Sequence, residues 1–549
     1  MIAYLIAFLA FFGWWLSRSK VSWRDRLLAI AVVIWFGISA RLVADKTMNG
    51  FALALSSFPI VITVWTAWLF ISRSFKPTVQ RIGFCIAMFL TFAYFTLIRW
   101  DGLDAMQAAE MNWRWTLTKE QQFLTAHGAK AAKDNGDVKS WALQPGDCPE
   151  FRGPQRDGVL AGVSIVADWN EQPPKQLWRK RVGPGWSGLI VVDGHIVTQE
   201  QRGKVESVVC YDAATGNELW AHDDSVRFEE ALAGAGPRGT PTFAGGRIYA
   251  LGGLGTLNCL KPESGEVIWS HDITKDADVP AADLPQWGYS VSPLVVDGLV
   301  VVFAGGTSEK SVLAYRADDG KLAWTAAGGK QSYSSPQLAT LSGQKQIVMH
   351  DTTAVRVLNI ADGKEVWNHP NGSEMSLPML QPHVVGPNDL VVSITPGMAR
   401  VEVSPQRSEA EIAPRWETNK LRPDFSDFVI HKGCIYGLND GILCCLDVET
   451  GNQVWKKSRL GHGQILLLAD QDALLVSSDK GEIILISVNR DGQKELGRFQ
   501  AIDGKTWNGP VLVGNRLFLR NAAEMAAYEI NVQSSKPQSP ASRLPTNSL

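Results

Sequence analysis

A ten-residue motif that ends in tryptophan recurs along the chain and constrains its fold more than any other feature. Its clear copies are YDAATGNELW at Trp220, LKPESGEVIW at Trp269, YRADDGKLAW at Trp324, LNIADGKEVW at Trp367 and LDVETGNQVW at Trp455. Weaker copies end at Trp178 and Trp416, and a degenerate copy has Leu496 in the tryptophan position. Such a period indicates a repeat architecture in which each unit is one supersecondary element.

Each copy of the motif predicts two antiparallel strands joined by a tight turn. The glycine supplies the left-handed backbone position of that turn. The tryptophan falls at a fixed place on the outgoing strand, where a flat ring can fill the space between neighbouring sheets. A second strand pair, such as RGTPTFAGGRIYAL or WNGPVLVGNRLFLR, lies between motifs. Four strands per unit is the content of a propeller blade.

The unit count predicts an all-β fold over residues 147–531, an eight-bladed β-propeller of four-stranded antiparallel blades. The last unit, near Ile530, has no tryptophan strand after it, whereas a lone strand at Gln176–Val182 precedes the first complete unit. We expect that lone strand to complete the last blade, because closure leaves no open sheet edge. Seven blades is the alternative, if one weak unit is an insertion.

Four apolar stretches precede the repeat and predict a transmembrane region of about four helices over residues 1–100. They are Ile2–Leu16, Leu27–Ala40, Phe51–Ser72 and Ile82–Ile98. The last two are long enough to span a hydrocarbon core of ~30 Å, and the first two are short. A signal peptide in the first stretch is the alternative, although that stretch lacks a basic start and a small-residue cleavage pattern.

The charges of the loops predict the orientation of these spans. The first loop carries four basic residues and the third carries three, whereas the second carries only Arg41 and Lys46. The positive-inside rule places loops one and three in the cytoplasm, so the chain leaves the fourth span on the outer side. We expect a protein integral to the cytoplasmic membrane, with its propeller on the periplasmic, extracytoplasmic side.

The segment between membrane and repeat, residues 101–146, predicts a juxtamembrane helix over Asp101–His127 and a polar linker over Gly128–Gly146. The tail at 532–549 is rich in Ser and Pro, which predicts disorder.

Composition argues against two classes of partner. The net charge is −2 and no long Lys/Arg run lies outside the membrane loops, so nucleic acid is a poor partner. The seven cysteines form no CxxC pair, and the nine histidines show no metal-ligand spacing, so no metal site is predicted.

The repeat resembles the one in PQQ-dependent quinoprotein dehydrogenases and in the outer-membrane assembly lipoprotein with the same eight-bladed fold. The segments DCPEFRGPQRDGV, GWSGLIVVDGHIVTQEQRG and RFEEALAGAGPRGTPTFAGGRIYALGGLGTLNCL look closer to PQQ-binding-like propeller proteins with membrane anchors. This resemblance covers roughly residues 147–530. It implies the fold strongly and the function weakly, because the family mixes enzymes with non-enzymes.

The resemblance raises the question of a quinone cofactor. Quinoprotein alcohol dehydrogenases place a vicinal disulfide against the quinone, and this chain has Cys444 and Cys445. The repeat register favours a structural role, because Cys445 precedes Gly451 by six residues just as Cys210 precedes Gly216. The family's enzymes also need a Glu and an Asn as Ca²⁺ ligands and an Asp base, and none of these maps onto this chain. Catalytic residues therefore stay unknown, no cofactor is assigned, and PQQ with calcium stays open.

Polar and aromatic residues precede the inner strands of several units, where they would surround the axial channel on one face. These candidate binding residues are Trp186, Glu200, Gln201, Arg202, Arg238, Trp287, Tyr289, Tyr333, Asp427 and Trp507. The arginines would suit an anionic ligand, and the rings a planar group or a peptide. In the alternative interpretation the rings pack between blades and the charges are solvated.

Two functions follow as expectations. The first is a non-enzymatic module that binds a small ligand or a protein partner, or assists assembly, at the membrane surface. The second is a membrane-bound PQQ-dependent dehydrogenase that oxidises alcohols or sugars.

Overall fold

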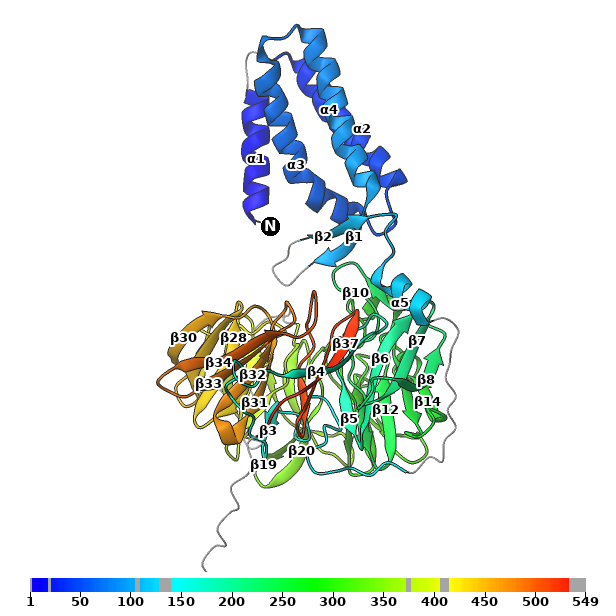
Figure 1. Ribbon diagram of the computed structural model, residues 1–549, viewed down its shortest axis with the longest axis vertical. Helices are drawn as coiled ribbons and strands as arrows, with labels where there is room; N and C mark the ends of the chain where they lie inside the picture. The colour runs from blue at the N-terminus through cyan, green and yellow to red at the C-terminus, as the bar shows by residue number, and fades with distance from the viewer. Residues whose placement is uncertain are drawn as a thin grey trace, which may run out of the picture. The chain divides into compact units, whose positions relative to one another are not determined.

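The computed structural model of the protein describes residues 2–17, 21–103, 109–127, 140–307, 309–371, 377–404 and 414–532. The contacts within the chain divide it into two compact units (Figure 1). The first comprises Met1–Thr118 with Ala231–Gly234, and the second comprises Lys119–Glu230 with Ala235–Leu549. The first unit holds the apolar helices and the second holds the repeats.

Four helices form most of the first unit. They are α1 (Ile2–Ser17), α2 (Trp23–Val43), α3 (Gly50–Ile71), which continues into the short helix η1 (Ser72–Ser74), and α4 (Pro77–Leu97). Among the described residues, α2, α3 with η1, and α4 are long and apolar enough to cross a membrane. The 16 residues of α1 reach only about 24 Å. The described residues therefore contain three candidate membrane spans, whereas the sequence predicted about four.

Aromatic packing holds the helices together. The ring of Trp65 on α3 is buried, and its centroid lies 5.3 Å from those of Phe11 and Trp15 on α1 and 5.1 Å from that of Phe84 on α4. A large ring shared by three helices provides the close packing that helices in a lipid environment need, since the lipid is as apolar as their surfaces.

The segment after α4 corrects the juxtamembrane helix predicted over Asp101–His127. Its first part is a hairpin of β1 (Ile98–Leu103) and β2 (Ala109–Trp113), and only α5 (Lys119–His127) is helical. Gly102 adopts a φ of 115°, and the register of the hairpin shifts between Trp100 and Gly102. An Asp-Gly pair favours such a bulge and disfavours a helix interior. Most of the predicted linker, at 128–139, and nearly all of the tail, at 533–549, lie outside the described residues.

The second unit contains eight four-stranded antiparallel blades, which confirms the predicted eight-bladed propeller. Blade 1 consists of β5 (Ile190–Val192), β6 (His195–Arg202), β7 (Val205–Asp212) and β8 (Glu218–Asp224). Blade 2 has β11 (Thr242–Ala244), β12 (Arg247–Leu251), β13 (Thr256–Leu260) and β14 (Val267–Asp272). Blade 3 has β15 (Leu294–Val296), β16 (Leu299–Phe303), β17 (Val312–Arg316) and β18 (Leu322–Ala326). Blade 4 has β19 (Gln337–Leu341), β20 (Gln344–His350), β21 (Ala354–Leu358) and β22 (Glu365–Pro370).

The second half of the ring repeats this order. Blade 5 has β23 (His383–Val385), β24 (Asp389–Ile394), β25 (Gly397–Glu402) and β26 (Trp416–Thr418). Blade 6 has β27 (Val429–His431), β28 (Cys434–Asn439), β29 (Ile442–Asp447) and β30 (Gln453–Arg459). Blade 7 has β31 (Gln464–Leu468), β32 (Ala473–Ser477), β33 (Glu482–Val488) and β34 (Gln493–Gln500). Blade 8 has β35 (Val511–Val513), β36 (Arg516–Arg520), β37 (Glu524–Glu529) and β4 (Lys175–Arg181). Short elements between and beside the blades are β3 (Val159–Leu160), β9 (Glu229–Glu230), β10 (Gly234–Ala235), α6 (Ile273–Asp276), η2 (Ala281–Asp283) and η4 (Ala469–Gln471).

The first strands of neighbouring blades contact one another around the ring, including β35 of blade 8 with β5 of blade 1, so these strands are innermost. As predicted, the N-terminal strand β4 closes the ring by pairing with β37, with Trp178 opposite Ala527. Blade 7 carries the short β3 as a fifth strand, parallel to its inner strand β31.

Six of the repeat tryptophans join their blade to the next one. Their indole N–H groups donate to backbone carbonyls of the following blade, at 2.9–3.1 Å. The pairs are Trp178 to Ala213, Trp220 to Pro262, Trp269 to Ala317, Trp324 to Ile360, Trp416 to Val448 and Trp455 to Asn489. The indole nitrogen of Trp367 is buried without a partner among the described residues.

The repeat glycine accommodates the incoming ring. Gly216 has a φ of 67°, and a Cβ placed on it would lie 2.7 Å from the Trp178 ring. The same arrangement recurs at Gly320, where a Cβ would lie 2.8 Å from the Trp269 ring. Two separate reasons therefore require glycine at this position: the left-handed backbone of the turn, and the tryptophan ring that leaves no room for a Cβ.

We expect Gly216→Ala to destabilise the propeller more than Gly298→Ala does. Gly298 has a similar φ of 77° but open space where a Cβ would be, so its substitution costs only the backbone strain of about 1–2 kcal/mol. Gly216→Ala adds displacement of the Trp178 ring, a packing cost of about 1–3 kcal/mol. Thermal unfolding of the two full-length variants measures the difference, and equal melting temperatures would refute the role of the ring.

Candidate functional site

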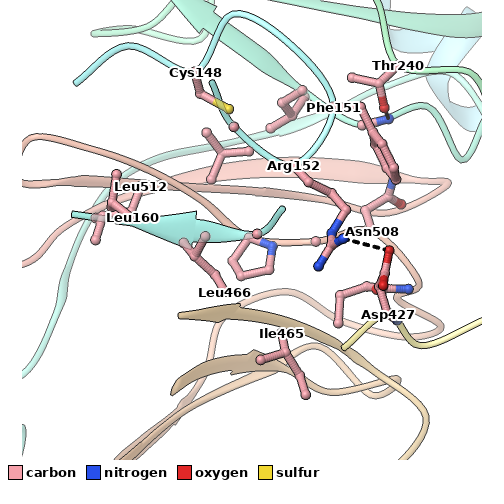
Figure 2. A pocket seen from close by; sticks show the side chains of 18 of the residues that line it. Cys148, Phe151, Arg152, Leu160, Thr240, Asp427, Ile465, Leu466, Asn508 and Leu512 are labelled. Atoms are coloured by element: carbon pink, nitrogen blue, oxygen red, sulfur yellow. Dashed lines mark hydrogen bonds and ion pairs between the residues drawn. The ribbon is translucent and has the colours of Figure 1, made fainter. Parts of the chain in front are cut away.

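The inner strands enclose an axial cavity of about 160 Å³, drawn in Figure 2. Its walls come from the segment at 146–160, from the entrances of several blades and from the inner strands of blades 7 and 8. Leu160 and Leu512 lie on one side of the cavity, and Arg152, Asp427 and Asn508 lie on the other (Figure 2). The site thus has one apolar wall and one polar wall.

The segment at 147–160, which we call the channel segment, pairs with the innermost strands. The backbone groups of Cys148 and Val191 on β5 exchange hydrogen bonds of 2.8 and 2.9 Å. The carbonyl of Pro149 accepts from the N–H of Phe243 on β11 at 2.8 Å, and β3 pairs with β31. These strands otherwise present unpaired edges to the channel, so the segment satisfies polar groups that burial would leave costly.

Arg152 fastens the channel segment to blades 5 and 6. Its Nη1 lies 2.9 Å from an Asp427 carboxylate oxygen, and its Nη2 donates to the carbonyl of Phe428 at 2.8 Å. Nη1 also lies 3.0 Å from His383 Nε2. The same Nε2 lies 3.3 Å from the other carboxylate oxygen of Asp427, so the imidazole contacts both members of the ion pair. His383 and Asp427 are buried and the Arg152 side chain is 9% exposed, so the cluster is a largely desolvated ion pair with an imidazole beside it.

Arg156 fastens the same segment to blade 3. Its guanidinium is buried, pairs with Glu150 at 2.9 Å and donates to the carbonyls of Ser292 at 2.9 Å and Pro293 at 3.1 Å. Burial lowers the pKa of Arg156, and Glu150 offsets part of that effect. The sequence of this segment carries part of the family resemblance, but its two arginines were not among the residues predicted to surround the channel.

Aromatic rings surround the mouth of the cavity. The rings of Trp186 and Trp507 lie 4.7 Å apart, and that of Phe425 lies 5.4 Å from Trp507. Lys505 Nζ lies 4.8 Å above the Trp507 ring, a cation–π distance. The Asn508 amide nitrogen donates to the carbonyls of Trp186 and Ser187, both at 2.9 Å. Trp186 and Trp507 are thus brought together from opposite ends of the repeat sequence.

Three buried polar atoms of residues that line the cavity have no hydrogen-bond partner in the described part of the chain. They are Trp507 Nε1, Asn508 Oδ1 and Arg238 Nε. Arg238 otherwise pairs with Glu230 at 2.7 Å and lies 5.4 Å from the Phe228 ring centroid. Burial lowers its pKa, partly offset by Glu230. Two donors and one acceptor therefore stay unpaired within the packing of the described residues around the cavity.

Four of the predicted candidates, Trp186, Arg238, Asp427 and Trp507, line this cavity. Two others form a separate contact, since the rings of Trp287 and Tyr333 lie 5.1 Å apart. Neither of these two is part of the cavity wall.

The remaining predicted candidates make hydrogen bonds and ion pairs within the blades and their connections. Glu200 is fully buried, pairs with Arg202 at 2.5 Å and accepts from the N–H of Gly183 at 2.7 Å. Arg202 also pairs with Glu218, so no unpaired cation remains there for an anionic ligand. Gln201 bonds backbone groups within blade 1 and at Phe228. Tyr289 is buried and donates to the carbonyl of Ala304.

The residues around the cavity do not fit PQQ with calcium. Calcium takes six to eight oxygen ligands, yet Asp427 is committed to Arg152, and no group of three or more His, Cys, Asp or Glu side chains in the described ranges could hold a metal. The channel segment occupies part of the space, and Trp186 and Trp507 contact each other. No quinone-dependent step follows from this arrangement.

The positions of the vicinal cysteines Cys444 and Cys445 agree with the structural role that the repeat register favours. Cys445 pairs across the blade with Trp455, just as Cys210 pairs with Trp220 and Cys259 with Trp269. Cys444 and Cys445 are both buried with free thiols, and they belong to different hydrophobic clusters on the two faces of β29. Burial raises the pKa of Cys444 to about 11, which keeps that thiol protonated and unreactive.

Comparisons with known proteins agree with the repeat. A sequence model of the family described as "Outer membrane protein assembly factor BamB" matches residues 204–457. Quinohemoprotein alcohol dehydrogenase ADH IIB of Pseudomonas putida is 34% identical over 140 residues, covering 24% of this chain and 18% of the dehydrogenase. BamB of Yersinia pestis is 21% identical over 367 residues, covering 63% of this chain and 77% of BamB. The chain therefore spans less than a fifth of that dehydrogenase and about three quarters of BamB.

Two solved structures show low similarity to this chain. BamB from Moraxella catarrhalis has a TM-score of 0.45 and 14% identity, covering 65% of this chain and 97% of its own. Quinohemoprotein alcohol dehydrogenase ADHIIG from Pseudomonas putida HK5 has a TM-score of 0.49 and 15% identity, covering 75% and 85%. The sequence matches confirm the predicted resemblance to the PQQ-type repeat propellers.

We expect acid to loosen the channel segment through His383. Burial lowers the pKa of His383, and the charge of Arg152 lowers it further, whereas in a released segment the imidazole would titrate near its usual ~6.5. The stabilisation is therefore complete above about pH 6.5 and falls below it, by at most about 1.4 kcal/mol per pH unit. Protonation also places a second positive charge beside the Arg152 guanidinium, which the contact with Asp427 offsets only in part. Asp427, whose pKa is lowered, contributes only at still lower pH.

Hydrogen exchange of the peptide at 147–160, corrected for intrinsic rates, measures this effect at pH 7.5 and 5.0. The matched control is His383→Gln, which keeps an acceptor near the Nε2 position and does not titrate. Equal pH dependence in the wild type and the variant would contradict the role of His383.

Proposed function

We propose that the chain is a membrane-held binding module, whose propeller binds a ligand or a segment of a partner protein at the mouth of the axial cavity. The carrying observation is the cavity itself, with its apolar wall and the aromatic rings of Trp186, Trp507 and Phe425. An occupant that covers these apolar and aromatic groups removes their area from water, which favours binding. Polar groups beside them, such as the Asn508 amide, would fix its orientation.

The paired charges of the cavity support binding rather than catalysis. The Asp427 carboxylate is bound to Arg152, and the Arg238 guanidinium is bound to Glu230. A general base or an electrostatic catalyst needs a group free to act on the substrate. BamB of Yersinia pestis, which this chain matches over 77% of its length, is by its name an assembly factor, and we extend that class of role to this chain.

The charges of the membrane loops support an extracytoplasmic position for the module. The basic residues are concentrated before and in the first turn of α2, and between α3 and the first turns of α4. The end of α2 and its connection to α3 carry only Arg41 and Lys46. Under the positive-inside rule the α4 end of the bundle, and with it the propeller, belongs to the outer side.

A PQQ-dependent dehydrogenase of alcohols or sugars is the second candidate. The observation in its favour is the 34% identity to a quinohemoprotein alcohol dehydrogenase, although the match covers 18% of that enzyme. The paired carboxylates described above count against it.

A calorimetric titration decides between the two. We expect no heat of binding when PQQ is added with Ca²⁺ to the full-length protein in detergent, and no dye-linked oxidation of alcohols or glucose. Asp427 at the cavity is paired with Arg152, and the described residues hold no group of three or more acidic, His or Cys side chains that could bind the calcium. Stoichiometric PQQ binding together with dye reduction would overturn the binding-module proposal.

Photo-crosslinking in intact cells tests the mouth directly. We expect a photoreactive residue in place of Phe425 to form an adduct, because Phe425 lines the cavity and is only partly buried. The same residue in place of Leu322, which is exposed on the outer strand β18, is the matched control. The Phe425 adduct should disappear when Asn508→Leu is added. Adducts of equal yield at both positions, or no adduct at Phe425, would contradict the proposal.

A further inference from the structure

Two tryptophans at the end of the hairpin of the first unit, the last residue of β2 and the second residue after it, are stacked on each other and exposed. The ring centroids of Trp113 and Trp115 lie 5.0 Å apart with planes 11° from parallel. Trp113 is 44% exposed and Trp115 is 63% exposed, and the exposed Leu117 follows them. Exposed indole rings leave apolar area in contact with water, which is unfavourable. A fixed pair of exposed rings therefore marks a contact surface.

The residue between the two rings caps two candidate membrane spans. The backbone N–H of Arg114 donates to the carbonyl of Leu97, the last residue of α4, at 2.9 Å. Its guanidinium Nη1 donates to the carbonyls of Thr96 on α4 at 3.1 Å and Val43, the last residue of α2, at 3.3 Å. The last carbonyls of a helix lack intrahelical partners and carry partial negative charge, so a cation there is favoured. The turn is thus tied to the ends of α2 and α4.

A second arginine holds the turn from the other side. Arg99 on β1 is buried, pairs with Asp101 at 2.8 Å and donates to the carbonyl of Thr116. The Thr116 hydroxyl and N–H both donate to the carbonyl of Trp113, at 2.7 and 3.0 Å. The backbone around the rings is therefore fixed by hydrogen bonds, and the exposure of the rings follows from the fold of the turn.

The apolar surface of the helices continues onto this turn. Leu42 and Val43 at the end of α2 and Leu97 at the end of α4 are exposed, as side chains that face lipid are. Tyr94, one turn before the end of α4, contacts the Trp113 ring at 6.1 Å. The 21 residues of α2 rise about 32 Å, close to the ~30 Å hydrocarbon thickness. The rings consequently lie at the level where the hydrocarbon ends.

We propose that the turn at 113–117 is an interfacial anchor, with Trp113 and Trp115 inserted among the headgroups of the lipid bilayer where α2 and α4 end. Indole rings favour this layer because their apolar body and polar N–H match its mixed chemistry. Arg114 reaches the helix carbonyls from the same layer, as long basic side chains near helix ends do. The second unit begins two residues after Leu117, so the anchor fixes the point at which the chain leaves the membrane.

Fluorescence in vesicles tests this anchor. The full-length protein and its Trp113→Phe/Trp115→Phe variant are reconstituted in phosphatidylcholine, and their difference spectrum isolates the pair from the 21 tryptophans of the chain. Phenylalanine keeps the exposed rings apolar, and unchanged thermal unfolding verifies that the variant folds. The matched control is Trp141→Phe, since Trp141 is buried against His195 in the second unit.

We expect lipids brominated near the headgroup to quench the emission of the pair at least about twofold, because rings in the interface meet these bromines. Aqueous iodide should quench it little, and neither agent should quench the emission of Trp141. Quenching by iodide alone would place the rings in water and overturn the proposal. Protection from both agents would mean that protein covers them, which overturns it as well.

Discussion

The propeller depends on one recurring contact, in which the tryptophan of one blade lies on the glycine turn of the next, as at Gly216, Gly265, Gly320, Gly363 and Gly451. The ring fills the wedge between two sheets, its N–H satisfies a carbonyl of that turn, and its face occupies the place of the missing Cβ. The contact therefore sets the spacing between neighbouring blades and carries it around to Trp178, which joins blade 8 to blade 1.

A ring built in this way leaves a channel whose inner strands have one unpaired edge. The channel segment resolves this by pairing with β5, β11 and β31 and by sending Arg152 and Arg156 to different blades of the ring. What remains is a smaller cavity with an apolar and a polar wall. The cavity is the part of the channel that the channel segment leaves open. Residues of the channel segment and residues of the blades both line it, so both determine which ligand it can bind.

Periodicity made most of the fold predictable from sequence. The motif is local, so its turn, its strands and its tryptophan could be placed without knowing the partners, and the count predicted eight blades and the closing strand β4. The hairpin β1–β2 was missed because its strands are short and it follows an apolar helix directly. There the Asp101-Gly102 pair is a weaker signal than the surrounding aromatic residues.

The candidate site was predictable only in part, because its members come from different blades. Position before an inner strand indicated Trp186, Arg238, Asp427 and Trp507, which line the cavity. The same rule also selected Glu200 and Arg202, whose ion pair within blade 1 depends on side-chain directions that a sequence does not reveal. Arg152 was missed because it belongs to no repeat. Its one signal is a basic residue in a Gly- and Pro-rich segment that precedes the first blade.

The strand that closes the ring also has a consequence for synthesis. Apart from the short β3, the chain makes β4 before any other strand of the blades, yet its partner β37 begins only at Glu524. At a typical 5–20 residues per second, the ribosome needs about 20–70 s to produce the intervening chain. During that time the partner strand of β4 does not exist, whereas the blades in between can form as they are made. The ring can therefore close only when one of its earliest strands meets its last.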